Sequence, residues 1–327
     1  YDLLVIGAGA AGLWGARAAA VRARTDMGTA GSPAGHPPRD PALRLAVVDG
    51  RAKVGAKILM SGGTRCNLTH TVVRPEDYRG GNVHRIARVL RAHPPAASLR
   101  IFTEELGVPV KTEEATEKIF PADDRAATVL GGLLGALDRE RIPLLRERRW
   151  VGLERLEPGA DSAALPAGAH GGGWRVRVVD PAGNERDPLI ARRLLVCTGG
   201  RSYPKTGSDG GAWEILRQCG HRIVEPVPAL SPLLLADGFH AGLSGISLPV
   251  RLLLRIDGRD AALASGPLLW THLGASGPAA LDLSGPWARA RHDLPQARLE
   301  TFADFLPGRS AEELEAEWLE EARRRPT

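Results

Sequence analysis

Two glycine-rich stretches near the start of the chain carry residue types that bind a phosphate-bearing cofactor. The first is Gly7-Ala8-Gly9-Ala10-Ala11-Gly12, a G-x-G-x-x-G pattern. Its first glycine permits a sharp turn after a strand, the second leaves room for a pyrophosphate, and the third lets a helix pack closely. The N–H groups at the start of that helix then face the phosphates. The predicted dinucleotide contacts are Gly7, Gly9, Ala10, Ala11 and Gly12.

The second stretch runs from Gly55 to Thr69 and reads G-A-K-I-L-M-S-G-G-T-R-C-N-L-T. Its small residues let the backbone approach a flat or anionic ligand. Its lysine and arginine can neutralise phosphate or hydrogen-bond the anionic edge of a flavin, and its asparagine can donate and accept. The predicted contacts are Lys57, Ser61, Gly62, Gly63, Arg65, Cys66 and Asn67. An ordinary Gly-Gly turn with solvated basic side chains is the alternative.

Two further candidate sites follow short apolar runs. Asp49 comes directly after the run 45–48, where the dinucleotide fold places the acid that takes the ribose hydroxyls, and Gly50 follows it. The alternative for Asp49 is a cap on a turn with Gly50. Thr198-Gly199-Gly200 follows the run 194–197 and can bring its backbone to a cofactor without a Cβ in the way. A β-bulge or turn is the alternative there.

These residues need a parallel sheet to bring them together. The runs 3–6, 45–48 and 194–197 are typical of buried strands, and an Ala-rich helical pattern follows Gly12. The polar, Gly- and Pro-rich segment 24–43 is predicted to be a surface loop between the first helix and the second strand. Further helices are predicted over 83–99 and 127–137, and further strands over 150–156 and 174–179.

The composition changes after three prolines between 226 and 232. The run 248–256 alternates partly, and Asp257-Gly258 is typical of a hairpin turn. Ser310 and Glu313 form a capping box for a final helix. We therefore predict a dinucleotide-binding domain over 1–228 and a second, β-rich domain over 229–327.

Four segments, in order, resemble one family of bacterial flavoproteins. They are G-x-K-x-x-x-S-G-G-x-R-C-N-x-T at 55–69, K-I-F-P at 118–121, C-T-G-G-R-S-Y-P-K-T-G-S at 197–208 and T-H-L-G-A-S-G-P at 271–278. On these motifs the chain is similar to NAD(P)/FAD-dependent oxidoreductases of the BaiN-like, or aminoacetone-oxidase-like, kind. A methyltransferase or an NAD dehydrogenase built on the same glycine turn does not account for these segments.

The resemblance implies an α/β fold, with a Rossmann-like FAD-binding domain and an inserted β-rich, barrel-like second domain that carries a helix. It implies an enzyme that holds FAD and passes hydride or electrons between the flavin and a small-molecule substrate. NAD(P)H as a visiting reductant and oxygen as an oxidant are both left open. Val151 is placed near the adenine, and Tyr203 and His272 are the expected proton donors or substrate anchors near the flavin.

Composition narrows the classes of partner and the cellular location that the protein could have. The net charge is +5 over 327 residues, but the arginines are scattered among acids, so no nucleic-acid partner is expected. No apolar run reaches the ~20 residues that span a bilayer, and the chain opens on a core strand without a leader, so we expect no membrane and a cytoplasmic location. The three cysteines form no close pair, which fits a reducing compartment. No metal site is predicted, and the oligomeric state is left open.

The chain departs from the family near its end. Family members continue with a segment of the G-L-Y-F-A-G-E type that returns to the flavin, and nothing after Thr301 resembles it. Thr64 also stands where the family usually has a third glycine. A truncated, non-catalytic flavoprotein or an FAD-binding module is therefore the alternative to an active oxidoreductase.

Overall fold

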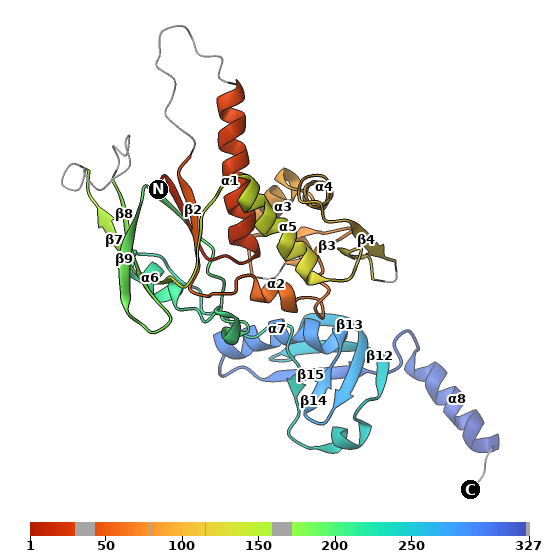
Figure 1. Ribbon diagram of the computed structural model, residues 1–327. Helices are drawn as coiled ribbons and strands as arrows, with labels where there is room; N and C mark the ends of the chain where they lie inside the picture. Colours follow the sequence, from red (N-terminus) through yellow and green to blue (C-terminus); the bar gives the residue numbers. More distant parts are fainter. Residues whose placement is uncertain (30–42, 79, 115, 159–171, 325–327) are drawn as a thin grey trace. The chain divides into compact units, whose positions relative to one another are not determined.

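A four-stranded parallel sheet lies at the centre of the first part of the chain (Figure 1). The computed structural model describes residues 1–29, 43–78, 80–114, 116–158 and 172–324. The strand order is β10-β1-β2-β6, and all neighbours are parallel. The strands are β1 Leu3–Ile6, β2 Leu45–Val48, β6 Leu144–Leu145 and β10 Arg193–Val196. The three predicted strands of this sheet are confirmed, and their carboxyl ends meet at one edge.

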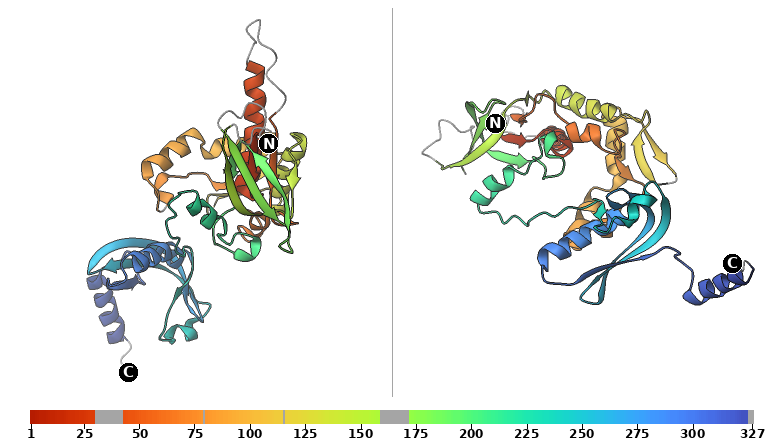
Figure 2. Two further views of the ribbon diagram at one scale, coloured as in Figure 1. Left: turned by 90° about the vertical axis from the view of Figure 1, so that its left-hand side faces the viewer. Right: turned by 90° about the horizontal axis from the view of Figure 1, so that it is seen from below.

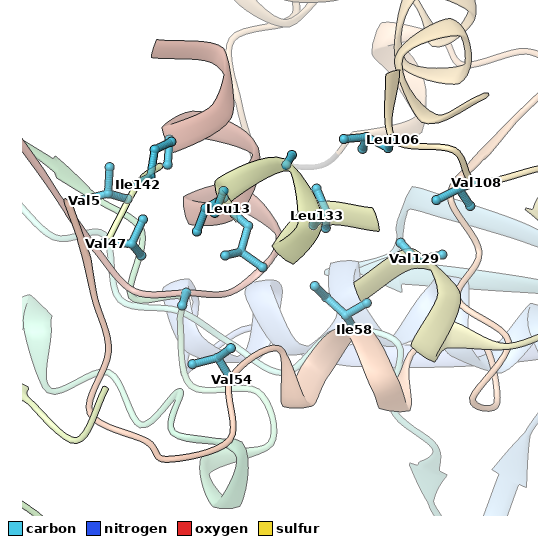
Figure 3. Close-up of a cluster of buried hydrophobic side chains, with 14 of the residues drawn as sticks. Val5, Leu13, Val47, Val54, Ile58, Leu106, Val108, Val129, Leu133 and Ile142 are labelled. Carbon is cyan, nitrogen blue, oxygen red and sulfur yellow. The ribbon is translucent and has the colours of Figure 1, made fainter. Parts of the chain in front are cut away.

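Alternating side chains of β1 and β2 fill two separate cores, because successive residues of a strand face opposite sides of a sheet. Val5 and Val47 pack with Leu13 and Leu133 on the side of α1 Ala10–Thr29 and α5 Ala126–Arg139. Figure 3 shows these residues together with Ile58 of α2 Ala56–Met60. On the other side, the remaining side chains of β1 and β2 pack against a small antiparallel sheet. This second core comprises Leu4, Ile6, Ala46 and Val48 of the parallel sheet and Trp150, Val176 and Val178 of the antiparallel one.

That antiparallel sheet is formed by β7 Arg149–Leu156, β8 Gly173–Val179 and β9 Glu185–Ala191. Its first two strands confirm the strands predicted over 150–156 and 174–179. A third sheet, in the order β3-β5-β4, joins β3 Thr69–His70, β4 Val110–Glu113 and β5 Lys118–Pro121.

Two of the helical predictions need correction. Helix α1 continues to Thr29, so the loop predicted from residue 24 begins too early, and the rest of that loop at 30–42 lies outside the described residues. The helix predicted over 83–99 is two helices, α3 Val83–Ala92 and α4 Pro95–Arg100. They separate because a proline disfavours helical backbone at the residue before it and lacks the N–H that would continue the helix. A π-helical turn, Ile101–Glu105, follows directly.

The short elements that connect the rest of the first unit are η1 Pro75–Asp77, η3 Pro204–Thr206 and α6 Ala212–Gln218. The chain divides into two compact units, Tyr1–Ile223 and Val224–Thr327. The domain boundary predicted from the sequence, between 228 and 229, comes a few residues after this division between Ile223 and Val224.

The second unit is built on a five-stranded antiparallel sheet in the order β11-β14-β13-β12-β15. Its elements are β11 Leu233–Leu234, η4 Phe239–Leu243, β12 Ser247–Ile256, β13 Arg259–Thr271, β14 Gly274–Ser276, α7 Pro278–Asp293 and β15 Leu299–Asp304. The predicted hairpin at Asp257-Gly258 is confirmed, since Ile256 pairs with Arg259. The sheet is curved, and α7 packs on one face of it (Figure 2). Among the described residues β11 and β15 form the two edges of this sheet.

A final helix, α8 Ala311–Arg324, closes the described chain. The predicted capping box is confirmed. The Ser310 hydroxyl accepts from the Glu313 N–H at 3.1 Å, and a Glu313 carboxylate oxygen accepts from the Ser310 N–H at 2.9 Å.

Candidate cofactor site

A cavity of about 1120 Å³ lies at the carboxyl edge of the parallel sheet in the first unit. It exceeds the ~300–1,000 Å³ of ordinary small-molecule sites, as expected for an extended ligand. The segments that follow β1, β2 and β10 all line it, together with α2, which carries Lys57, and the start of α1. Its lining includes these predicted residues: Gly7, Gly9, Ala10, Ala11, Asp49, Gly50, Lys57, Ser61, Cys66, Asn67, Thr198 and Gly199.

The three glycines of the first turn have different surroundings. A Cβ on Gly7, whose φ is +107°, would lie 2.4 Å from the Cys197 carbonyl oxygen, and one on Gly12 would lie 1.8 Å from the Gly7 carbonyl oxygen. A Cβ on Gly9 would meet no atom of the described residues within 4 Å. Gly7 and Gly12 are therefore required by the fold itself, whereas Gly9 borders open space in the cavity beside the first turn of α1.

The Asp49 carboxylate fixes the glycine turn from the second strand. It accepts from the Ala8 N–H at 2.7 Å and from the Arg51 N–H at 2.9 Å. Asp49 therefore caps a turn, as the alternative interpretation of this residue predicts. Since each carboxylate oxygen has a further lone pair, these two bonds leave acceptor capacity toward the cavity that Asp49 lines.

Lys57 connects its helix to the loop after β10. Its ammonium donates to the Ser202 hydroxyl at 3.0 Å and lies 3.9 Å from the place a Cβ on Gly199 would occupy. Gly199 has a φ of +77°, and its missing Cβ makes room for the Ser208 hydroxyl. That buried hydroxyl donates to the Gly200 carbonyl at 2.8 Å. A positive charge and a side-chain-free backbone therefore border the same part of the cavity.

The loop 61–67 contributes Ser61, Cys66 and Asn67 to the lining. Among the described residues the buried Asn67 Oδ1 atom has no hydrogen-bond partner, and a donor group of a ligand could satisfy it. Burial raises the pKa of the Cys66 and Cys197 thiols, and both border the cavity. These thiols stay protonated at neutral pH, which suits a lining role better than a nucleophilic one.

Several predicted residues lie outside the lining: Gly12, Gly62, Gly63, Arg65, Val151, Gly200 and Tyr203. Arg65 instead pairs with two carboxylates, Glu113 and Asp124. Val151 is 38% exposed, and its neighbours Arg149 and Trp150 take the place in the lining that was predicted for it. Tyr203 is 67% exposed and has a φ of +52°. His272 is an exposed residue in the turn between β13 and β14 of the second unit.

Sequence reasoning missed two groups of lining residues. An apolar group comprises Trp14, Phe102, Val129 and Leu133, and a basic group comprises Arg51, Arg148 and Arg149. The Trp14 and Phe102 rings lie 5.3 Å apart, although 88 positions separate them in the sequence. The basic group reaches the site because the Arg148 N–H donates to the Asp49 carbonyl at 2.9 Å. Arg51 follows β2, Arg148 follows the two-residue strand β6 and Arg149 begins β7, so no single sequence pattern marks the group.

Two other classes of site find no support among the described residues. No group of three or more His, Cys, Asp or Glu side chains there could hold a metal ion. No helix in the described part of the chain is long and apolar enough to cross a membrane.

The parallel sheet, the glycine turn at the start of α1 and the strand-end acid define a Rossmann-like dinucleotide-binding unit. The chain belongs to the family described as the HI0933-like protein Rossmann domain, whose model matches residues 1–321. The resemblance to BaiN-like flavoproteins and the expected Rossmann-like FAD-binding fold are thereby confirmed.

Two curated relatives match over most of the chain. The ribosomal RNA dihydrouridine synthase of Haemophilus influenzae is 28% identical over 312 residues, which cover 95% of this chain and 65% of that protein. The 3-dehydro-bile acid delta(4,6)-reductase of Clostridium scindens is 26% identical over 271 residues, covering 83% and 60%. The chain thus spans less than two thirds of the length of these relatives.

Among solved structures, the 3-ketosteroid-delta4-(5alpha)-dehydrogenase of Rhodococcus jostii RHA1 is similar with a TM-score of 0.44 and 14% identity. The match covers 76% of this chain and 59% of that one.

Proposed function

We propose that the chain binds FAD in the cavity of its first unit and serves a flavin-dependent oxidoreductase. The observation that carries this proposal is the open space at Gly9, beside the first turn of α1, where the backbone N–H groups have no acceptor within the helix. The pyrophosphate of FAD would lie there, and the matching family supports a flavin as the ligand.

The remaining lining residues suit the two ends of FAD. Asp49 takes the ribose hydroxyls, and the Arg149–Trp150 backbone borders the adenine side, in place of the more exposed Val151. At the other end, Lys57 supplies positive charge to the electron-rich edge of the flavin ring, while Gly199 lets the backbone approach it. Tyr203 and His272 remain the candidate proton donors or substrate anchors.

The reaction we propose is reduction of a carbon–carbon double bond in a ring that also carries a carbonyl group. Bound FAD supplies hydride and electron transfer, and NADH or NADPH visits as the reductant. The names of both curated relatives support this substrate class, since one describes synthesis of dihydrouridine and the other a delta(4,6)-reductase. A small unsaturated ring is the proposed substrate. A uridine within RNA presents the same chemistry and is tested beside it.

The proposal is tested with the full chain loaded with FAD under anaerobic conditions. NADH or NADPH is expected to bleach the visible flavin band, and a cyclic enone or uridine to restore it. Restoration only by an RNA oligonucleotide would assign the substrate to nucleic acid. A flavin that binds but that neither nicotinamide reduces would support the alternative, an FAD-binding module without turnover, and would contradict the proposed reaction.

A further inference from the structure

The loop 61–67 has an unusual backbone for a segment that borders a ligand cavity. Four of the five residues from 62 to 66 have a positive φ: Gly62 at +56°, Gly63 at +65°, Thr64 at +72° and Cys66 at +62°. For the two that are not glycine, this conformation is disfavoured by their Cβ atoms. Such strain persists only where the surrounding structure holds it in place, and it concentrates at functional sites.

Arg65, the one residue in that run without a positive φ, is held from three sides. Its Nε donates to Asp124 at 2.9 Å, and both terminal nitrogens donate to a single Glu113 oxygen at 3.0 and 3.1 Å. Its guanidinium also lies 3.8 Å from the centroid of the Phe120 ring. These partners belong to β4, to β5 and to the turn before α5, so they fix Arg65 to a different part of the sheet system. We call Arg65, Glu113 and Asp124 the Arg65 cluster.

Further groups face the cluster and keep its acids ionised. The Thr116 hydroxyl and the Arg65 guanidinium lower the pKa of Glu113, and Lys118 adds a weaker attraction. The Lys111 ammonium and the Arg65 guanidinium lower the pKa of Asp124. Two carboxylates already neutralise Arg65, so little of its charge remains for a phosphate.

Two backbone hydrogen bonds fix the shape and the position of the loop 61–67. The Cys66 N–H donates to the Ser61 carbonyl at 2.9 Å and closes the loop. The Ala126 N–H donates to the Thr64 carbonyl at 2.9 Å and joins the loop to the start of α5. On one side of Arg65 the Thr64 carbonyl thus binds the start of α5, and on the other Cys66 lines the cavity, whereas Arg65 is not part of the lining.

We propose that the Arg65 cluster is a positioning device that holds the strained loop 61–67 in the shape that binds the cofactor. Arg65 is then not a cofactor ligand: it acts through the backbone of Ser61, Cys66 and Asn67. This proposal rests on the proposed FAD site.

The test combines FAD titration with amide hydrogen exchange of residues 61–67 in the cofactor-free full chain. Arg65→Gln is expected to weaken FAD binding about tenfold, because it removes three contacts of a partly exposed guanidinium. It should also speed exchange at the Cys66 amide. Asp124→Asn is expected to do the same more weakly. The double variant Arg65→Gln/Asp124→Asn should bind FAD no more weakly than Arg65→Gln alone, because the two residues act as one unit.

A matched control comes from the sheet of β7 to β9. Arg155 also pairs with a carboxylate, Glu157, and lies 5.6 Å from the Trp174 ring, but it is outside the cavity lining. Arg155→Gln should leave FAD binding and exchange in the loop unchanged.

Two results would overturn the proposal. The first is weaker FAD binding in Arg65→Gln with unchanged loop exchange and no effect of Asp124→Asn, which is the behaviour of a direct ligand. The second is a loop whose exchange stays that of the wild type in every variant. If the wild-type chain fails to bind FAD, the proposed function fails, and the exchange data obtained without FAD still decide whether the Arg65 cluster holds the loop.

Discussion

At the scale of single residues, the glycines of the first turn show how far a motif can be interpreted. The pattern G-x-G-x-x-G correctly predicts a turn between β1 and α1. It assigns Gly12 to close packing, and the structure agrees, since a Cβ there would lie 1.8 Å from the Gly7 carbonyl oxygen. Gly9 differs because the fold leaves space around it. Gly12 is thus required for folding, whereas Gly9 is the glycine that we propose leaves room for the ligand, and the two roles can be tested separately.

Replacing Gly12 with alanine is expected to destabilise the first unit by about 1–3 kcal/mol or more, because the added methyl group overlaps backbone that cannot move freely. The measurement is urea denaturation followed by circular dichroism. Gly131 of α5 is the matched control, since a Cβ there meets nothing within 4 Å. Gly131→Ala should stabilise the protein by about 0.5–1 kcal/mol, as for any helix-interior glycine. A Gly12→Ala variant as stable as the wild type would show that the turn is not packed as described.

Arg65 and Val151 mark the limit of prediction at this scale. An arginine in a glycine-rich loop is a reasonable phosphate ligand when only its neighbours in sequence are known. Its actual partners lie 48 and 59 positions away, in segments whose pairing with the loop has no local signal. Whether a strand residue such as Val151 faces a cavity depends on register. The irregular pairing between Trp150 and Gly152 changes that register.

At the scale of elements, segments with a clear apolar pattern were predictable and the segments without one were not. The buried strands β1, β2 and β10 and the helix α5 followed from their apolar patterns. The two-residue strand β6, which brings Arg148 to Asp49, and the π-helical turn Ile101–Glu105, which brings Phe102 to the cavity, have no such pattern. The partners of Arg65 in loop 61–67 also come from three separate segments, β4, β5 and the turn before α5.

The loop 61–67 is expected to loosen in acid. Glu113 and Asp124 have pKa values lowered below the ordinary range, so the stabilisation they give is present above the ordinary carboxyl pKa of about 4 and is lost as the pH falls through the lowered values. Amide exchange at Cys66, corrected for its intrinsic pH dependence, should therefore rise only at strongly acidic pH. In Arg65→Gln the rise should begin at higher pH, since one cause of the lowered values is gone. Identical pH profiles for the two proteins would contradict this account of the cluster.

At the scale of the whole molecule, the division into two units decides how a ligand affects stability. The cavity is lined entirely by residues of the unit Tyr1–Ile223. The motif at 271–278 belongs to the other unit. There Gly274 and Gly277 serve the fold, since a Cβ on either would lie within 3 Å of a backbone atom. Its resemblance to the family motif is therefore explained in part by sheet geometry, and the role of His272 stays a prediction.

Differential scanning calorimetry of the full chain is expected to show two transitions, of which FAD raises only one. At a hundredfold excess of FAD over its Kd, the first unit gains about 2.7 kcal/mol from mass action. Riboflavin, which lacks the pyrophosphate and adenosine, should give a smaller shift. A shift of the transition of the unit 224–327 alone would place the ligand in the other unit.

The most direct measurement is an FAD titration of the wild-type chain beside Gly9→Val, with bound flavin separated from free flavin by equilibrium dialysis. The wild type is expected to bind one FAD per chain. Gly9→Val should unfold at the same temperature as the wild type, because a Cβ there has free space around it. It should nevertheless retain no flavin, because that space is where we propose the pyrophosphate binds. A Gly9→Val protein that binds FAD as tightly as the wild type would contradict the assignment of this cavity.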